Sequence, residues 1–547
     1  MLNCSIKLRN FAICRNRLYF CRPIKKAMIK RLFPKFLLFS LMLVSGFLFS
    51  QDKATSKLAN ELFNDGNFSA ALDQYINLLK DKPEDIKFNY RAGVCYLNTN
   101  IDKSNAISYL EKVIASEEAD PNTHYLLGRA YAFAYRFPKA IKSFENFKEV
   151  NKGNNANLQD VEKQIEYAYN AIEIMKFRLD VTFQNMGPTI NSTSPDYYPF
   201  VPLDESYLIY NTKRDDGSNE LPDGSFNSEI YISRVKNGKY TNARKLDQNV
   251  NTLNGSEEVI GLSADGKHIL FYYDNEEHYG DLFIADYKND NVKNIVKLPK
   301  VINSKNYEIA ASISKFGDVI YFASDREGGY GGVDIYSCRI LPNGKWGPPQ
   351  NLGPNVNTEY DEDFPNVTSD NKTLYFSSKG HTSMGGYDIF KATWNSIKRN
   401  WADVKNIGYP LNTPEDNMNF RASKTGRTGY ISSLRAHGYG DLDIYSVTFN
   451  EVDPQYTVLK GYVNASDSTQ IKDVFISVLD LQTDELYGSY MTNPISGRYI
   501  IILPPGDYNV LVEVPGFEMY TENIEIYGKS SFRSVIKKDY ILKPTGQ

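Results

Sequence analysis

Between residues 54 and 177, apolar side chains recur at helical intervals. In the first such segment, which ends at Pro83, they stand three, four and seven positions apart, for example at Ala71, Tyr75 and Leu78. Two further segments of similar length repeat the spacing, and residues 157–177 add one more apolar stripe. A period of three to four residues places these side chains on one face of a helix. The pattern therefore predicts pairs of packed helices over residues 51–177, ended by a capping helix.

From residue 178 onward the pattern changes to short apolar strands that repeat every 52 to 55 residues. Each repeat has a short strand that ends in an acidic, an aliphatic and an aromatic residue, and these triplets start at Glu229, Asp281, Asp334, Asp388 and Asp443. Between repeats stands an Asn-Ser or Asn-Thr corner, at Asn251, Asn303, Asn357 and Asn412. A repeat of this length with about four strands is one blade of a β-propeller, so residues 178–450 are expected to form five blades.

The two ends of this array complement each other. The fifth repeat stops after Phe449 without an outer strand, whereas residues 178–190 hold such a strand with no blade before it. An unpaired outer edge would invite aggregation. We therefore expect the strand in residues 178–190 to complete the fifth blade and close the ring.

In residues 456–544 the repeat is gone, and strands follow one another at hairpin spacing. Alternating apolar residues predict a small β-sandwich. The helical repeats carry apolar and small residues at tetratricopeptide positions, such as Gly66, Ala71, Gly93 and Gly128. The expected fold class is thus multidomain: an α-helical tetratricopeptide solenoid, then a five-bladed β-propeller, then a β-sandwich.

The concave face of a tetratricopeptide array often receives a peptide or a helix of another protein. The Asn, Tyr and Arg side chains expected on that face of this chain can satisfy peptide backbone groups. The residues expected there are Asn60, Asn64, Tyr90, Asn98, Tyr125, Arg129 and Phe133. The alternative is that these are ordinary solvated positions on a spacer.

Composition narrows the function classes. The chain has 62 basic and 66 acidic residues, a formal net charge of −4, which gives no electrostatic reason to expect nucleic acid as a partner. The acidic residue of the strand repeat occurs in every blade, which favours a structural role over a catalytic or metal-binding one. We expect no bound metal and no cofactor.

The competing class is an enzyme, because propellers also precede the catalytic domain of prolyl-oligopeptidase-type hydrolases. Such a hydrolase needs a nucleophile elbow followed by an acid and a histidine. No G-x-S-x-G motif follows the propeller and no histidine follows His437, so we expect no catalytic residues and no enzyme. A third class is a binder of carbohydrate or peptidoglycan fragments that uses aromatic residues of the propeller.

The start of the chain predicts export. Lys30, Arg31 and Lys35 precede an apolar run from Phe36 to Phe49, which is typical of a secretory signal over residues 28–50. A membrane anchor is the alternative, but a run of about 14 residues is shorter than the roughly 20 that span a bilayer. Residues 1–27 are interpreted as a mis-annotated extension ahead of Met28. Ser50 and Gln51 stand where a lipoprotein would need a cysteine, so no direct lipid anchor is expected.

Several motifs resemble known families. Tyr321-Phe322-Ala323-Ser324 and Ser263-Ala264-Asp265-Gly266 resemble the TolB-type propeller, and Gly497-Arg498-Tyr499 with the Pro-Pro-Gly turn near 504–506 resembles the carboxypeptidase regulatory-like domain. The order of parts resembles the PorE-type periplasmic proteins of Bacteroidetes.

That resemblance implies a non-enzymatic scaffold at the outer membrane. Its implied partners are other envelope proteins of type IX secretion or gliding, including PorP/SprF-like proteins. Family members usually also have a lipid cysteine and a C-terminal OmpA-like domain. Neither is expected here, so direct anchoring to lipid or to the cell wall is not expected either.

Overall fold

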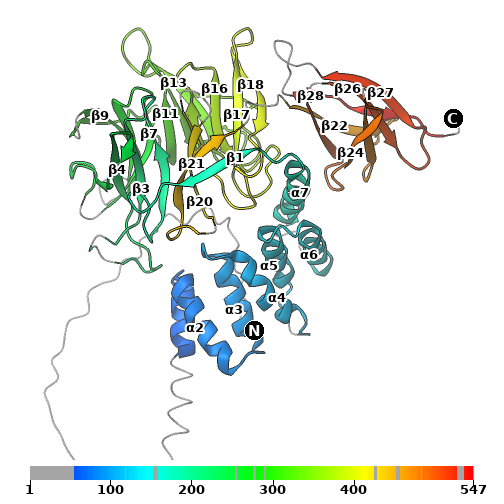
Figure 1. The fold of residues 1–547 in the computed structure, drawn as a ribbon, viewed down its shortest axis with the longest axis horizontal. Helices are drawn as coiled ribbons and strands as arrows, with labels where there is room; N and C mark the ends of the chain where they lie inside the picture. Colours follow the sequence, from blue (N-terminus) through cyan, green and yellow to red (C-terminus); the bar gives the residue numbers. More distant parts are fainter. Residues whose placement is uncertain are drawn as a thin grey trace, which may run out of the picture.

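The computed structural model describes residues 55–545 except 118, 152–157, 216, 218–219, 253–254, 275–278, 289–290, 424–427, 436, 451–455, 482, 505 and 527–534. The predicted signal over residues 28–50 lies outside the described residues, as do residues 1–27. Figure 1 shows the helices, in blue to cyan, next to a larger group of green to yellow sheets, with a smaller pair of orange and red sheets near the C-terminus.

The helices form one short layer, which we call the helical layer. Residues 55–64 are helical and lead into the helices that follow. These are α2 (Phe68–Asp81), α3 (Ile86–Leu97), the 3₁₀ helix η1 (Lys103–Asn105), α4 (Ala106–Ile114), α5 (Asn122–Phe133), α6 (Phe137–Val150) and α7 (Leu158–Met175).

Local sequence explains where these helices begin and how closely they pack. The Asp85 side chain accepts a hydrogen bond from Phe88 N (2.9 Å) and caps α3. A Cβ atom at Gly93 would lie 2.6 Å from Leu110, and one at Gly128 would lie 2.5 Å from Phe144. Glycine at these two positions therefore allows α3 to approach α4, and α5 to approach α6.

Five small antiparallel sheets follow, and each is built mainly from consecutive strands. The first sheet contains β2 (Asp196–Phe200), β3 (Tyr207–Thr212), β4 (Glu229–Lys236), β5 (Lys239–Tyr240) and β6 (Arg244–Lys245). The second contains β7 (Ser256–Leu262), β8 (His268–Asp274), β9 (Tyr279–Lys288) and β10 (Asn291–Lys297). The third contains β11 (Glu308–Ile313), β12 (Val319–Ser324), β13 (Asp334–Arg339) and β14 (Gln350–Asn351). The fourth contains β15 (Glu362–Val367), β16 (Thr373–Ser378), β17 (Asp388–Asn395) and β18 (Asn400–Asn406). The fifth contains β19 (Arg421–Ala422), β20 (Thr428–Ser433), β21 (Asp443–Phe449) and β1 (Val181–Asn185).

These five sheets contact one another in cyclic order, as the blades of a propeller do. The first strands β2, β7, β11 and β15 contact in sequence. Asn366 of β15 donates to Phe420 O (3.1 Å) beside the fifth sheet, and β20 in turn contacts β2. The outer strand of the fifth sheet is β1, which precedes the first sheet and pairs antiparallel with β21, Phe183 opposite Val447.

At each corner between sheets, a buried asparagine side chain forms hydrogen bonds with the backbone of the third strand of the preceding sheet. Asn357 accepts a hydrogen bond from Ile335 N (2.8 Å) and donates to Ile335 O (3.0 Å). Equivalent bonds join Asn251 to Ile230, Asn303 to Leu282, Asn412 to Ile389 and Asn191 to Ile444. The repeated corner is thus a hydrogen-bonding device that holds the end of each blade.

The repeated acidic residue has a structural role beside this corner. Asp388 accepts hydrogen bonds from Met384 N (2.9 Å) and Asn406 Nδ2 (2.8 Å). Asp334 and Asp443 make matching bonds with Asn351 and Asn185. In the first two sheets, Lys245 and Lys297 take the place of the asparagine and form ion pairs with Glu229 and Asp281.

The C-terminal part consists of two sheets packed face to face. One contains β25 (Arg498–Leu503), β22 (Thr457–Ala465), β28 (Val535–Lys537) and β29 (Tyr540–Leu542), and the other contains β24 (Glu485–Met491), β23 (Phe475–Asp480), β26 (Gly506–Glu513) and β27 (Tyr520–Ile526). Between them lies an apolar core that includes Leu459, Ile476, Tyr499 and Val510.

The fold class expected from the sequence is wrong, because it made an α-helical tetratricopeptide solenoid a main element. The described residues form mostly small antiparallel sheets, and helices are the minor part. The helix pairs extend over one short layer, and loops of the neighbouring sheets pack against it. The described chain is a β-rich protein with a propeller-like ring. The periodicity of the sequence predicted the helices but not the loops that pack against them.

Candidate binding surfaces

The helical layer packs against loops of the fourth and fifth sheets. Tyr167 OH of α7 donates to Lys379 O (2.6 Å), and Asn170 Nδ2 donates to Ser383 O (2.8 Å). Further contacts join Asn100 to Asp441, Lys103 to Glu415 and Tyr135 to Tyr409. One side of the helical layer is therefore occupied by the chain's own propeller-like ring.

Two predicted groove residues lie close to this internal contact. The Phe133 ring lies 5.1 Å from Lys103 Nζ and 5.6 Å from Arg129 Cζ. Lys103 in turn pairs with Glu415 of the ring, and the positive charge of Arg129 also acts on that carboxylate. These residues are therefore placed beside the interface between the two parts.

Other predicted groove residues are engaged within the helical layer. Tyr125 OH donates to Asp160 Oδ2 (2.6 Å), and burial raises the pKa of Tyr125. Asn122 Nδ2 donates to Tyr90 OH (3.3 Å). The polar groups of these residues have partners inside the protein.

The three predicted asparagines differ in exposure. Asn60 accepts a hydrogen bond from Tyr75 OH (3.1 Å) and is half-buried. Asn98 is exposed and donates to Val94 O (2.8 Å) at the end of α3, and Asn64 is exposed. Of the seven predicted residues, Asn64 and Asn98 are thus exposed and the other five are half-buried, and their role as a binding groove stays a prediction.

The opposite side of the ring carries an exposed aromatic patch. We define it by Phe316, which is 78% exposed, Trp394, which is 37% exposed, and Ile397, which is 92% exposed, together with Tyr321, which is only 9% exposed and lines the same hollow as Phe316 and Trp394. The turn that contains Phe316 follows β11, the first strand of the third sheet, and the turn that contains Ile397 follows β17, the third strand of the fourth sheet. The loops that contact the helical layer instead follow the second strands β16 and β20 and the fourth strand β18. Successive connections in an antiparallel blade alternate between its two ends, so the patch faces away from the helical layer.

A hollow of about 200 Å³ lies in this patch. It is lined by Ser314, Phe316, Asp318, Val319, Tyr321, Arg339, Asn371 and Trp394. Trp394 is held edge-on against the buried Trp401, with ring centroids 5.3 Å apart. Arg339 Nη1 pairs with Asp318 Oδ2 at 2.9 Å, so the hollow combines aromatic rings with charged and amide groups.

Sequence reasoning missed Phe316, although the repeat contains a signal. Phe316 stands in the turn Ser314-Lys315-Phe316-Gly317, at the position that Asp265 and Asp370 occupy in neighbouring blades. Those aspartates accept hydrogen bonds from their own turns, from Ser263 and from Thr368. An aromatic residue in place of a turn-forming aspartate is not needed for the turn itself, which makes this surface a candidate for binding another molecule.

Within the part of the chain that the structure describes, no group of three or more His, Cys, Asp or Glu residues could hold a metal ion. The two described cysteines are both free and buried, and burial raises the pKa of the thiols to about 12 for Cys95 and about 11 for Cys338. No helix among the described residues is long and apolar enough to cross a membrane.

Comparisons with known proteins give no family. No family model matches the sequence, and a comparison with curated proteins gives no match. Among solved structures, the complex of BT0996 with RGII is 10% identical, with 54% of this chain and 96% of the matched protein covered and a TM-score of 0.33. The RRP9 WD40 repeats are 10% identical, with 49% and 97% covered and a TM-score of 0.28.

Two enzymes are also among the similar structures. The periplasmic gluconolactonase PpgL of Pseudomonas aeruginosa is 10% identical, with 60% of this chain and 85% of the gluconolactonase covered and a TM-score of 0.26. The 3-chlorocatechol 1,2-dioxygenase of Rhodococcus opacus 1CP is 10% identical with a TM-score of 0.15. The match covers 62% of the dioxygenase and 18% of this chain. Similarities at these scores carry no argument about activity or ligand.

Proposed function

We propose that this protein is a non-enzymatic scaffold that binds another protein of the bacterial envelope. The observation that carries the proposal is the exposed aromatic patch on the side of the ring that the helical layer leaves open. Exposed aromatic clusters of this kind are typical of protein interfaces, where a few large side chains provide most of the binding energy.

Phe316 is the best candidate for the centre of such an interface. Its ring is 78% exposed, and its turn is one that neighbouring blades build with aspartate. The turn therefore does not need an aromatic side chain for its own structure. Burial of this ring by a partner would provide the affinity.

The test compares two exposed aromatic residues on opposite sides of the ring. Phe316→Ser removes the ring from the patch, whereas Tyr307→Ser removes a ring that is 59% exposed in the connection before β11, on the side of the helical layer. Cross-linked proteins are recovered from the native envelope and quantified by mass spectrometry, and direct binding of the recovered partner is then measured. We expect Phe316→Ser to weaken binding at least tenfold, about 1.4 kcal/mol, and Tyr307→Ser to leave it unchanged.

A third variant distinguishes the helical layer from the patch. If Asn98→Ala combined with Arg129→Ala abolishes binding while Phe316→Ser does not, the partner binds the helical layer and the patch is not the interface. Loss in all three variants would indicate unfolding, which the thermal midpoint of each variant reveals.

The resemblance of the order of parts to PorE-type proteins supports a partner among components of type IX secretion or gliding, including PorP/SprF-like proteins. The predicted signal over residues 28–50 supports a periplasmic or outer-membrane location. Fractionation of native cells tests this part, and recovery of the protein only from the cytoplasm would contradict it.

A second candidate function is the binding of a carbohydrate or peptidoglycan fragment. The hollow beside Phe316 and Trp394 combines aromatic rings, on which sugar rings can stack, with the polar groups of Asp318, Arg339 and Asn371. Titration with peptidoglycan fragments should then change tryptophan fluorescence. The change should disappear in Trp394→Phe and persist in Trp346→Phe, and an unchanged spectrum in the native protein contradicts this candidate.

A further inference from the structure

A second cleft lies where the C-terminal sandwich meets α7 and the ring. It has a volume of about 380 Å³, and we call it the junction cleft. It is lined by Lys460, Gly461, Tyr462, Arg498, Lys537, Lys538 and Asp539. Arg498 connects it to both neighbours, because its Nη2 pairs with Glu166 of α7 at 2.9 Å and donates to His381 O (3.4 Å) in the ring.

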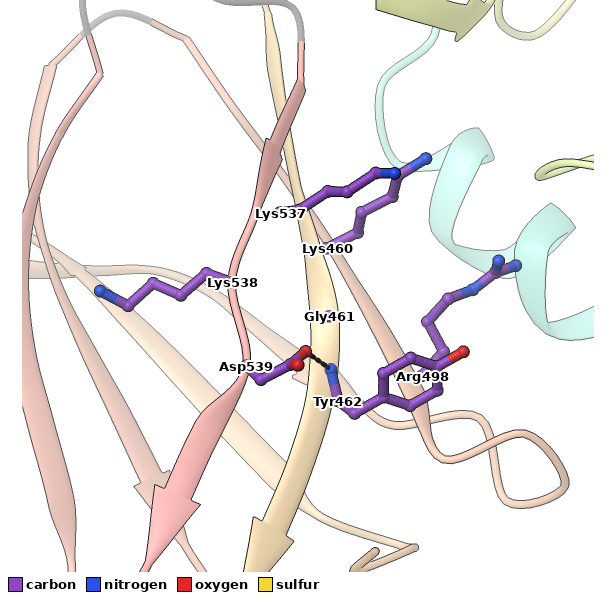
Figure 2. A pocket seen from close by; sticks show the side chains of 7 residues that line it. All are labelled: Lys460, Gly461, Tyr462, Arg498, Lys537, Lys538 and Asp539. Carbon is purple, nitrogen blue, oxygen red and sulfur yellow. Dashed lines mark hydrogen bonds between the residues drawn. The ribbon is translucent and has the colours of Figure 1, made fainter. Parts of the chain in front are cut away.

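Three cationic side chains share one face of the sandwich here. Lys460 of β22 is the register partner of Lys537 of β28, and Tyr462, two residues along β22, is the register partner of Arg498. Residues two apart on a strand point to the same side of a sheet. Figure 2 shows Lys460, Lys537 and Arg498 extending toward the side on which the helix passes, whereas Lys538 extends the opposite way.

Positive charge in the junction cleft is poorly balanced. Glu166 is shared by Arg498 and Lys163, and Asp539 accepts a hydrogen bond from Tyr462 N (2.8 Å). Among the described residues, no carboxylate forms an ion pair with Lys460 or Lys537. Burial, with the charges of Arg498 and Lys537, lowers the pKa of Lys460 to about 8.

The side chains of His381 and Lys163, which lie next to the junction cleft, are affected by the same excess of positive charge. Burial, together with the positive charges of Lys460, Lys163 and Arg498, lowers the pKa of His381 to about 4. Lys163 is itself buried, with its Nζ 4.2 Å from the centre of the Tyr360 ring. The interface of three parts of the chain thus holds several cations where burial makes each one costly.

We propose that the junction cleft binds a phosphate group carried by a larger molecule. A doubly charged phosphate would neutralise Lys460 and Lys537 together and would accept hydrogen bonds from both ammonium groups and from the guanidinium. A volume of about 380 Å³ is within the range of small-molecule pockets and leaves room for a group of sugar size beside the phosphate. The carrier is either a small phosphate ester or a lipid headgroup.

The experiment uses the full chain and glucose 6-phosphate as the probe. Calorimetric titration should show binding at least tenfold tighter than that of glucose, and the affinity should fall with added salt. Co-sedimentation with phosphatidylcholine vesicles, with and without phosphatidic acid, is the lipid arm. Binding to glucose 6-phosphate assigns a soluble ester, and binding only to the phosphatidic acid vesicles assigns a lipid headgroup.

Matched variants locate the site. Lys460→Gln and Lys537→Gln should each weaken binding at least tenfold. Lys543→Gln, which changes an exposed lysine of the same sandwich outside the cleft lining, should change it less than twofold. Thermal midpoints without ligand should not fall in the first two variants, since each removes a cation from a repulsive cluster. The proposal is overturned if neither probe binds, or if Lys543→Gln weakens binding as much as Lys460→Gln.

Discussion

The fourth and fifth sheets of the ring have nearly the same side-chain contacts. The fourth sheet is built from consecutive strands, whereas the fifth combines β19, β20 and β21 with β1 from the start of the ring. In the fourth sheet, Asn412 bonds to Ile389, 23 positions away, and to Asn406 of the outer strand. In the fifth, Asn191 bonds to Ile444, 253 positions away, and to Asn185 of β1. Closure of the ring therefore uses the same hydrogen bonds as an ordinary blade, and the difference lies only in how far apart the bonded residues are in sequence.

The two sheets also differ at the corner before the first strand. In the fourth sheet, Glu362 accepts hydrogen bonds from Thr358 N and Thr358 Oγ1, each at 2.7 Å. In the fifth, Asn417 accepts from Thr413 N (2.6 Å) and donates to Thr413 Oγ1 (3.1 Å). An amide group and a carboxyl group thus form comparable bonds at the two corners, but only the carboxyl group can lose a proton as the pH rises.

The largest expected effect concerns the outer strands. A variant with Gly-Ser residues in place of Val181–Asn185 should lose the folded ring and aggregate, because the fifth sheet then exposes an edge and loses the strand that anchors it. The Asn191 bonds and the contacts of β2 with β20 and β21 still join it to the first sheet, but they leave that edge open. The matched variant replaces residues 402–406 in the fourth sheet, which stays connected through the chain. Size-exclusion chromatography should find the second variant soluble and destabilised, and equal behaviour of the two would contradict closure by β1.

The next effect compares single corner asparagines. Asn191→Ala and Asn412→Ala each remove hydrogen bonds to a buried backbone N–H and C=O, and each should lower the free energy of unfolding by about 3 kcal/mol. Urea unfolding measures this loss. Hydrogen exchange should rise in β21 for the first variant and in β17 for the second. A loss confined to one variant would show that the two corners are not equivalent.

The smallest effect concerns pH. Burial raises the pKa of Glu362 from 4.5 to about 7, so between these values the folded carboxyl keeps a proton that the unfolded one has lost. The free energy of unfolding should therefore fall as pH rises from about 4.5 to about 7, by on the order of 1 kcal/mol from this group.

Glu362→Gln should reduce that slope and still fold, because Asn417 shows that an amide fits the same kind of corner. Urea unfolding at a series of pH values measures the slope. Glu327→Gln, which changes an exposed carboxylate, is the control and should leave it unchanged. An unchanged slope in Glu362→Gln would mean that Glu362 is ionised throughout this range.

The sequence predicted elements whose pattern is periodic. The spacing of Asp334, Asp388 and Asp443 revealed the strand repeat, and β1 pairs with β21 where an outer strand was expected. The prediction of a solenoid as a main element was wrong because apolar spacing indicates only which face of each helix is buried. It does not indicate which other parts of the chain pack against the helices. Contacts such as Asn100 with Asp441 join residues 341 positions apart and leave no periodic trace.

The binding surfaces were harder to predict for a similar reason. Arg129 and Phe133 were expected on an open groove, but Lys103 beside them pairs with Glu415 of the ring. Phe316 was visible only as a departure from the aspartate of neighbouring turns. Lys460 and Lys537 become neighbours through a parallel strand pairing that links distant segments, so only the structure brings them together.

The pairing of β1 with β21 also has a consequence for biosynthesis. Asn185 and Asp443 are 258 positions apart, and ribosomes add about 5–20 residues per second. The first strand of the ring therefore waits on the order of ten to fifty seconds before its partner exists. During that time its edge is open to other chains, so a factor that shields nascent or unfolded protein should matter more for this strand than for any strand of the fourth sheet.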